Sequence, residues 1–90
     1  MHRIRILISG KVQGVFFRDF IKTKALELGL KGYTRNLNKT TVEVLAEGHE
    51  LIINQLIQAC EKGVTGSEIA SVKISRELYK GEFKEFKIRG

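Results

Sequence analysis

IRILISGKVQGVFFRDFIKTKALELGL, residues 4–30, changes its hydrophobic period part-way along and thereby decides the fold. Apolar residues first alternate with other residues, which predicts a strand with one buried face, at Ile4, Ile6 and Ile8. They then recur every three or four positions, which predicts an amphipathic helix, at Phe17, Phe20, Ile21, Ala25 and Leu28. We expect this helix to end near Gly29. The stretch between the two patterns is therefore a strand-to-helix connection.

That connection, GKVQGVFFR at residues 10–18, has the composition of an anion-binding loop. Gly10 and Gly14 allow successive backbone N–H groups to turn inward, and a helix N-terminus adds unpaired donors. Arg18 adds a guanidinium that can grip two phosphate oxygens at once. The alternative is a plain glycine turn followed by a solvated arginine. The spacing matches neither the nucleotide P-loop nor the dinucleotide fingerprint, which argues against a nucleotide ligand.

The rest of the chain predicts three further strands and a second helix. We expect strands at 31–37, 41–47 and 70–78, a helix at 49–62, and a possible short final strand around Phe83, Phe86 and Ile88. Val42, Val44 and Ala46 should face one way, and residues 38–40 should form a hairpin turn. The order β-α-β-β-α-β predicts an α+β, ferredoxin-like split βαβ sandwich, an antiparallel sheet with two helices on one face. The other face should be more exposed.

Composition limits the classes of function. The 90 residues contain no linker, so we expect a single domain over residues 1–90. No segment reaches the roughly 20 apolar residues that span a bilayer, and no signal peptide is recognisable, which favours a cytoplasmic protein without a membrane partner. Cys60 is the single cysteine and should be a small buried side chain. The net charge of +6 favours acidic substrates or weak nucleic-acid contacts.

Two motifs make the chain resemble the acylphosphatase family over nearly its entire length. Residues 10–18 match the signature G-x-V-Q-G-V-x-F-R at every specified position, and residues 32–36 match G-x-V-x-N except that Thr34 replaces valine. Thr34 is similar in shape, but its hydroxyl needs a partner if it is buried. Lys39 and Thr40 stand where an Asp-Gly turn is common, so Asn38 could supply the left-handed residue of the hairpin.

The resemblance implies an enzyme that hydrolyses the carboxyl–phosphate bond of acyl phosphates, giving a carboxylate and inorganic phosphate without a metal or other cofactor. It implies that Arg18 and Asn36 are the catalytic pair. The expected phosphate-binding set is the loop and first helical turn, Gly14, Val15, Phe16, Phe17 and Arg18. Asn36 would orient the attacking water, but an amide cannot remove its proton, so the general base lies elsewhere and could be the substrate itself.

Other interpretations of these residues stay open. Asn38 shares a face with Asn36, although the motif spacing favours Asn36. Lys11 and Arg35 flank the expected pocket but are more simply surface charges. The aromatic residues of the loop and helix, Phe16, Phe17 and Phe20, are best explained by core packing, with Phe17 anchoring the loop. The five phenylalanines of the chain should all be needed for one core, which favours a monomer. An anion- or nucleic-acid-binding module is the competing function, although no specific nucleic acid is expected, and a metal-transfer domain is excluded by the lone cysteine.

Overall fold

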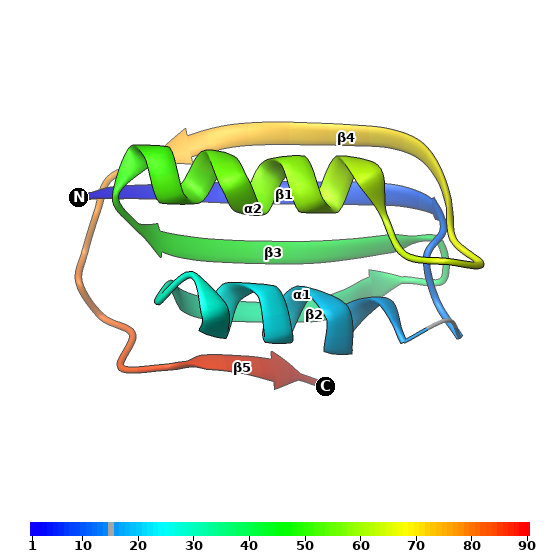
Figure 1. The fold of residues 1–90 in the computed structure, drawn as a ribbon, viewed down its shortest axis with the longest axis horizontal. Coiled ribbons are helices and arrows are strands. Elements are labelled where there is room, and N and C mark those ends of the chain that lie inside the picture. The colour runs from blue at the N-terminus through cyan, green and yellow to red at the C-terminus, as the bar shows by residue number, and fades with distance from the viewer. Residues whose placement is uncertain (15) are drawn as a thin grey trace.

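A computed structural model describes residues 1–14 and 16–90 and shows one sheet covered by two helices (Figure 1). The elements in chain order are β1 (His2–Lys11), α1 (Phe17–Glu27), β2 (Lys31–Asn38), β3 (Thr41–Gly48), α2 (Glu50–Lys62), β4 (Glu68–Glu77) and β5 (Phe86–Arg89). The strand order is β4-β1-β3-β2-β5. The predicted ferredoxin-like arrangement is confirmed.

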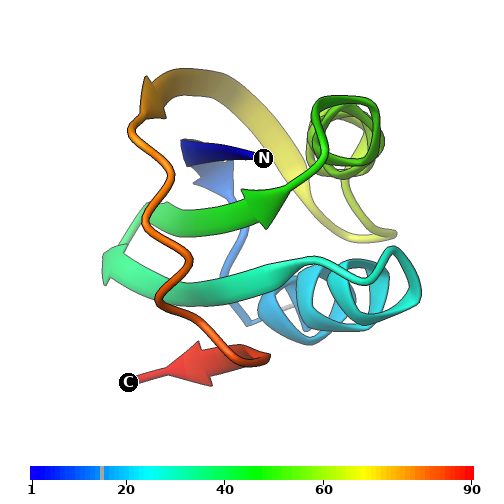
Figure 2. The same ribbon diagram turned by 90° about the vertical axis from the view of Figure 1, so that its left-hand side faces the viewer.

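β1 and β3 form the middle of the sheet. β1 pairs antiparallel with both β3 and β4, and β3 pairs antiparallel with β2. The short β5 adds to the outer edge of β2 in parallel, so the sheet is mixed rather than wholly antiparallel. Both helices lie on the same face, α1 over the β2 side and α2 over the β1 and β4 side (Figures 1 and 2).

The core between the sheet and the helices is built from the alternating and helical patterns of the sequence. From the sheet it takes Ile4, Ile6 and Ile8 of β1 and Val42, Val44 and Ala46 of β3. From the helices it takes Phe17, Ile21 and Ala25 of α1 and Ile53, Leu56 and Cys60 of α2. The apolar residues of the strand pattern and of the helix pattern therefore both lie in the core, as predicted. Cys60 is a small buried side chain, also as predicted. Burial raises the pKa of its thiol to about 12.

The face of the sheet opposite the helices is more exposed than the helix side, as predicted, with Arg35 and Leu37 of β2 in solvent, but part of it is buried. Every residue of β3 is buried, including Glu43, Leu45 and Glu47, which the alternation would place in solvent. The segment 78–85, between β4 and β5, crosses this face at the end where β1 begins and β3 ends, and it covers that end (Figures 1 and 2). The covering segment connects the two outer strands of the sheet, and its path could not be derived from strand periodicity.

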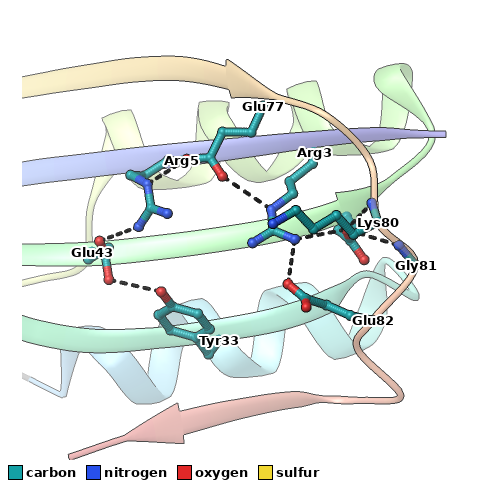
Figure 3. A network of polar contacts seen from close by, with 9 residues as sticks. Arg3, Arg5, Tyr33, Glu43, Glu77, Lys80, Gly81 and Glu82 are labelled. Atoms are coloured by element: carbon teal, nitrogen blue, oxygen red, sulfur yellow. Dashed lines mark hydrogen bonds and ion pairs between the residues drawn. The ribbon is translucent and has the colours of Figure 1, made fainter.

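Glu43 is the centre of one ionic cluster on the face opposite the helices (Figure 3). Its carboxylate accepts hydrogen bonds from Arg5 Nη1, from Arg35 Nε at 2.6 Å and from Tyr33 Oη at 3.2 Å. Burial alone would raise the pKa of this carboxyl, but the bonds from Arg35 and Arg5 outweigh burial and hold its pKa below the ordinary value. Arg5 Nε also donates to Glu77 at 2.8 Å and thereby lowers the pKa of Glu77.

Arg3 joins the covering segment to the sheet (Figure 3). Its guanidinium lies 3.4 Å from Glu47, 3.2 Å from Glu77 and 2.5 Å from Glu82, and it is 6% exposed. Glu47 in turn accepts hydrogen bonds from the backbone N–H groups of Lys80 and Gly81, at 3.0 and 3.3 Å. The ion pairs with these carboxylates compensate for the burial of the Arg3 charge, although Arg3 Nε, 3.2 Å from Glu77, makes no hydrogen bond with the described residues.

Several boundaries differ slightly from the sequence prediction. β4 begins at Glu68 rather than at residue 70, and β5 leaves Phe83 outside the final strand. The prediction that Asn38 is left-handed is wrong: among the described non-glycine residues, a positive φ occurs at Phe16. Instead, Asn38 Oδ1 accepts a hydrogen bond from Thr40 N at 3.0 Å, which forms the turn through a side chain. No helix in the described part of the chain is long and apolar enough to cross a membrane.

Candidate active site

A pocket of about 310 Å³ lies where the β1–α1 connection meets the end of β2. Its walls come from three segments and consist of Val12, Gln13, Gly14, Phe16, Phe17, Arg18, Asp19 and Asn36. Arg18 and Asn36, which are 18 positions apart in the sequence, therefore face a common space. Of the predicted phosphate-binding set, Gly14, Phe16 and Phe17 also line it, whereas Val15 lies outside the described residues.

The connection is tied to the β2–β3 hairpin. Gly10 N donates a hydrogen bond to the carbonyl oxygen of Thr40 at 3.0 Å, and Gln13 Nε2 donates to the carbonyl oxygen of Asn38. Gly14 then takes φ +76°, a conformation that glycine adopts without strain. These contacts hold the loop against the end of the sheet that carries Asn36.

Phe17 anchors the start of α1, as predicted. It is 1% exposed and makes an edge-to-face contact with Phe20, with ring centroids 6.2 Å apart. Phe16, in contrast, is 80% exposed, and its side chain contributes nothing to the core. The prediction that Phe16 is a core residue is therefore wrong. The helical stripe begins at Phe17, so the preceding residue is not held to that face.

The N-terminus of α1 opens onto the pocket. Phe20 N donates to Phe16 O at 3.0 Å, so by helix geometry the N–H groups of Phe17, Arg18 and Asp19 have no partner within the helix. Phe16 is the N-cap residue and gives no side-chain hydrogen bond to these groups. An exposed helix N-terminus of this kind offers donors and positive potential to an anion.

Arg18 is half-buried in the first turn of α1. Its Nη1 donates to the carbonyl oxygen of Arg89 in β5 at 3.5 Å. A guanidinium carries five N–H donors in a planar fork, so this single contact leaves donors for a ligand. The contact with β5 limits the directions that the long side chain can take, which favours a preorganised position beside the loop.

The side of the sheet on which Asn36 lies follows from its neighbours in β2. Arg35 donates to Glu43 on the face opposite the helices, so it does not flank the pocket. Thr34 is buried among the core residues on the helix side, and its Oγ1 donates to the carbonyl oxygen of Glu43 at 3.0 Å, which supplies the partner that its hydroxyl needs. Successive strand residues alternate between faces, so Asn36 lies on the helix side with Thr34. It is exposed there, at the pocket wall.

Three residues of the pocket wall were not predicted from the sequence: Val12, Gln13 and Asp19. Val12 and Gln13 lie within the signature and could have been included, because the loop must curve around its ligand. Asp19 follows Arg18 in the first helical turn, where an acidic residue is usually explained by the helix dipole alone. Lys11 and Asn38 are not among the lining residues.

The chain is similar to known proteins of one family. The family model described as Acylphosphatase matches residues 4–88. The chain belongs to the acylphosphatase family. An acylphosphatase from a strain of Dehalococcoides mccartyi is 40% identical over 90 residues, covering 99% of each chain. An acylphosphatase from Aeropyrum pernix is 42% identical over 88 residues, covering 97% of this chain and 87% of its own.

A solved acylphosphatase has the same fold. The crystal structure of the enzyme from Bacillus subtilis superposes with a TM-score of 0.95 at 30% identity, covering all of both chains. The mixed sheet of five strands with two helices is thus the architecture of the acylphosphatase family.

Proposed function

We propose that this member of the acylphosphatase family hydrolyses the carboxyl–phosphate bond of acyl phosphates, and that the pocket between α1 and β2 is its active site. The observation that carries the proposal is the convergence of Arg18, Asn36 and the N-terminus of α1 on one pocket. A cationic fork, backbone donors and a neutral amide in one place suit a phosphoryl group and a water molecule.

The phosphoryl group binds to the loop and to Arg18. Backbone N–H groups from Gly14 to Arg18 donate to the nonbridging phosphoryl oxygens, and the Arg18 guanidinium adds charge-assisted hydrogen bonds. The donors of Gly14 and of residues 16–18 are held in advance by the buried ring of Phe17 and by the hairpin contacts of Gly10 and Gln13. They stabilise the negative charge that shifts onto these oxygens and onto the leaving group in the transition state.

Asn36 positions the attacking water in line with the scissile bond. The water oxygen forms a bond to phosphorus as the bond from phosphorus to the acyl oxygen breaks, and the carboxylate leaves with the electron pair. The proton of the water passes to a phosphoryl oxygen, so an acyl phosphate dianion and water give a carboxylate and dihydrogen phosphate. Because a carboxylate is a good leaving group, neither a nucleophilic side chain nor a metal ion is needed.

Turnover of benzoyl phosphate tests this proposal. Arg18→Ala should lower kcat/KM by at least about 100-fold, equivalent to about 3 kcal/mol, because it removes a preorganised charge contact. Asn36→Ala should lower kcat by about 10–100-fold, because the water loses its orientation. Arg76→Ala and Asn54→Ala are matched controls, since both residues are exposed and lie outside the pocket. The proposal fails if the wild-type protein shows no turnover, or if both pocket variants are as active as the controls.

Acyl phosphates rather than nucleic acids are the anions we assign to this chain. RNA-binding domains of this topology stack bases on aromatic side chains across the free face of the sheet. Here residues 78–85 cross one end of that face, and Tyr33 is occupied by Arg89, whose guanidinium lies 4.0 Å from the ring centroid. Salt-dependent RNA binding that survives Arg18→Ala would favour the competing function.

A further inference from the structure

Phe16 combines two features that are unfavourable in the free protein. Its side chain is 80% exposed, and its backbone is left-handed, with φ 57° and ψ 31°. Among the described residues it alone combines a side chain with a positive φ. A bulky residue in this region is strained, and such strain is often found at ligand sites. Asparagine or glycine would fit the backbone better, and neither would expose a ring.

Neither the core nor the helix needs the ring. Phe17 and Phe20 supply the aromatic packing of α1. The backbone carbonyl of Phe16 accepts the first hydrogen bond of the helix, a role that any residue can fill. The ring is therefore explained by something outside the free protein's own packing.

The position of the ring matches the part of the substrate that Arg18 and Asn36 do not recognise. Phe16 lines the same pocket as those two residues, two positions before Arg18. The pocket volume of about 310 Å³ falls in the range of small-molecule sites and exceeds what a phosphoryl group alone requires. With the phosphoryl group at the helix N-terminus, the acyl group is left for the apolar part of the wall, formed by Phe16 and Val12.

We propose that Phe16 is a specificity-determining residue whose exposed ring contacts the acyl group, so that the enzyme prefers apolar, aromatic acyl phosphates over small ones. This inference rests on the proposed function and extends it to the substrate class. An aryl acyl group gains a ring contact and buries apolar area against Phe16, whereas an acetyl group covers little of the ring. The contact exists before and during bond cleavage, so it acts mainly through KM.

The test compares kcat/KM for benzoyl phosphate with kcat/KM for acetyl phosphate. Phe16→Asn and Phe16→Gly both remove the ring and both accept a left-handed backbone, so the loop can keep its shape. The ratio of the two kcat/KM values should fall about tenfold in both variants, a change of about 1.4 kcal/mol. General damage to the loop would lower both values and leave their ratio unchanged.

Leu51→Asn is the matched control. Leu51 is 76% exposed in the first turn of α2, which starts at the end of the sheet away from the pocket (Figure 1). Leu51→Asn should leave the ratio of kcat/KM for benzoyl phosphate to kcat/KM for acetyl phosphate at the wild-type value. If the wild-type protein hydrolyses both compounds and the Phe16 variants keep the wild-type ratio, this inference is overturned and the proposed function stands. If the wild-type protein hydrolyses neither, the proposed function is wrong and the inference falls with it.

Discussion

Replacing Glu43 by glutamine should destabilise the fold without touching the pocket. The glutamine keeps the size of the side chain and one acceptor oxygen, but it removes the negative charge that Arg5, Arg35 and Tyr33 surround. It also directs an NH2 group toward donors, which leaves part of the cluster without acceptors. The Arg5 side chain, 28% exposed, keeps Glu77 as a partner, while Arg35 at 44% exposed can turn to water.

The expected loss in the free energy of unfolding follows from the exposed fractions of these side chains. Breaking a fully buried ion pair costs about 3–5 kcal/mol. Glu43 is only 4% exposed, but both of its cationic partners reach solvent, so we expect about 2–3 kcal/mol, at or below the lower end of that range. For a domain of this size the same loss lowers Tm by roughly 10–20 °C. Urea denaturation followed by circular dichroism at pH 7 measures the free energy of unfolding directly.

The pH dependence supplies a second readout. The folded-state pKa of Glu43 is lowered, so its charge contributes stability above its unfolded pKa of about 4.3. That contribution is lost as the pH falls through the lower folded pKa. Acidification from pH 7 into this region should therefore cost the wild-type protein more stability than Glu43→Gln. A variant within about 0.5 kcal/mol of wild type at pH 7, with an unchanged acid profile, would refute the assignment of a buried charge cluster.

Two further substitutions probe the pocket and the sheet. Asp19→Asn removes a negative charge beside the phosphoryl site and should lower KM for benzoyl phosphate by about 2–3-fold. It should also destabilise the helix by about 0.3–1 kcal/mol, because an acidic residue in the first turn is favoured there. A loss of 100-fold or more in kcat would instead identify Asp19 as the general base. Gly32→Ala should cost at least about 3 kcal/mol, because its φ is +145° and a Cβ would lie 1.8 Å from the carbonyl oxygen of Leu45. Gly29→Ala is its control in urea denaturation, with a positive φ but open space, and should cost only about 1 kcal/mol; equal losses would contradict the steric explanation.

The sequence predicts the helix side of the sheet well because that side depends on local periodicity. Ile4, Ile6 and Ile8 alternate in the sequence and are all fully buried in the structure. The other side depends on contacts between distant segments. Glu43 and Glu47 resemble solvent-facing strand residues. Glu47 is buried against Arg3 and the backbone of residues 80 and 81, and Glu43 against Arg5, Arg35 and Tyr33. Periodicity holds no information about these contacts.

The pocket, too, could be predicted from the sequence only in part. The motif spacing placed Arg18 at the helix start and Asn36 on the adjacent strand, and the fold brings both to one pocket. The periodicity places Phe17, and not Phe16, on the apolar stripe of the helix, and Phe17 is buried while Phe16 is exposed. The left-handed backbone of Phe16 could not be predicted from the sequence, because bulky residues rarely adopt it.

A double-mutant cycle on Arg18 and Asn36 tests most directly whether the two side chains act on one phosphoryl group. Values of kcat/KM for benzoyl phosphate are measured for the wild type, Arg18→Ala, Asn36→Ala and the double variant. If Arg18 holds the phosphoryl group that the water on Asn36 attacks, removing either side chain makes the other ineffective. The kcat/KM of the double variant should therefore stay within about threefold of that of the less active single variant. Losses that add fully in free energy would show that the two residues act independently, which would contradict the account.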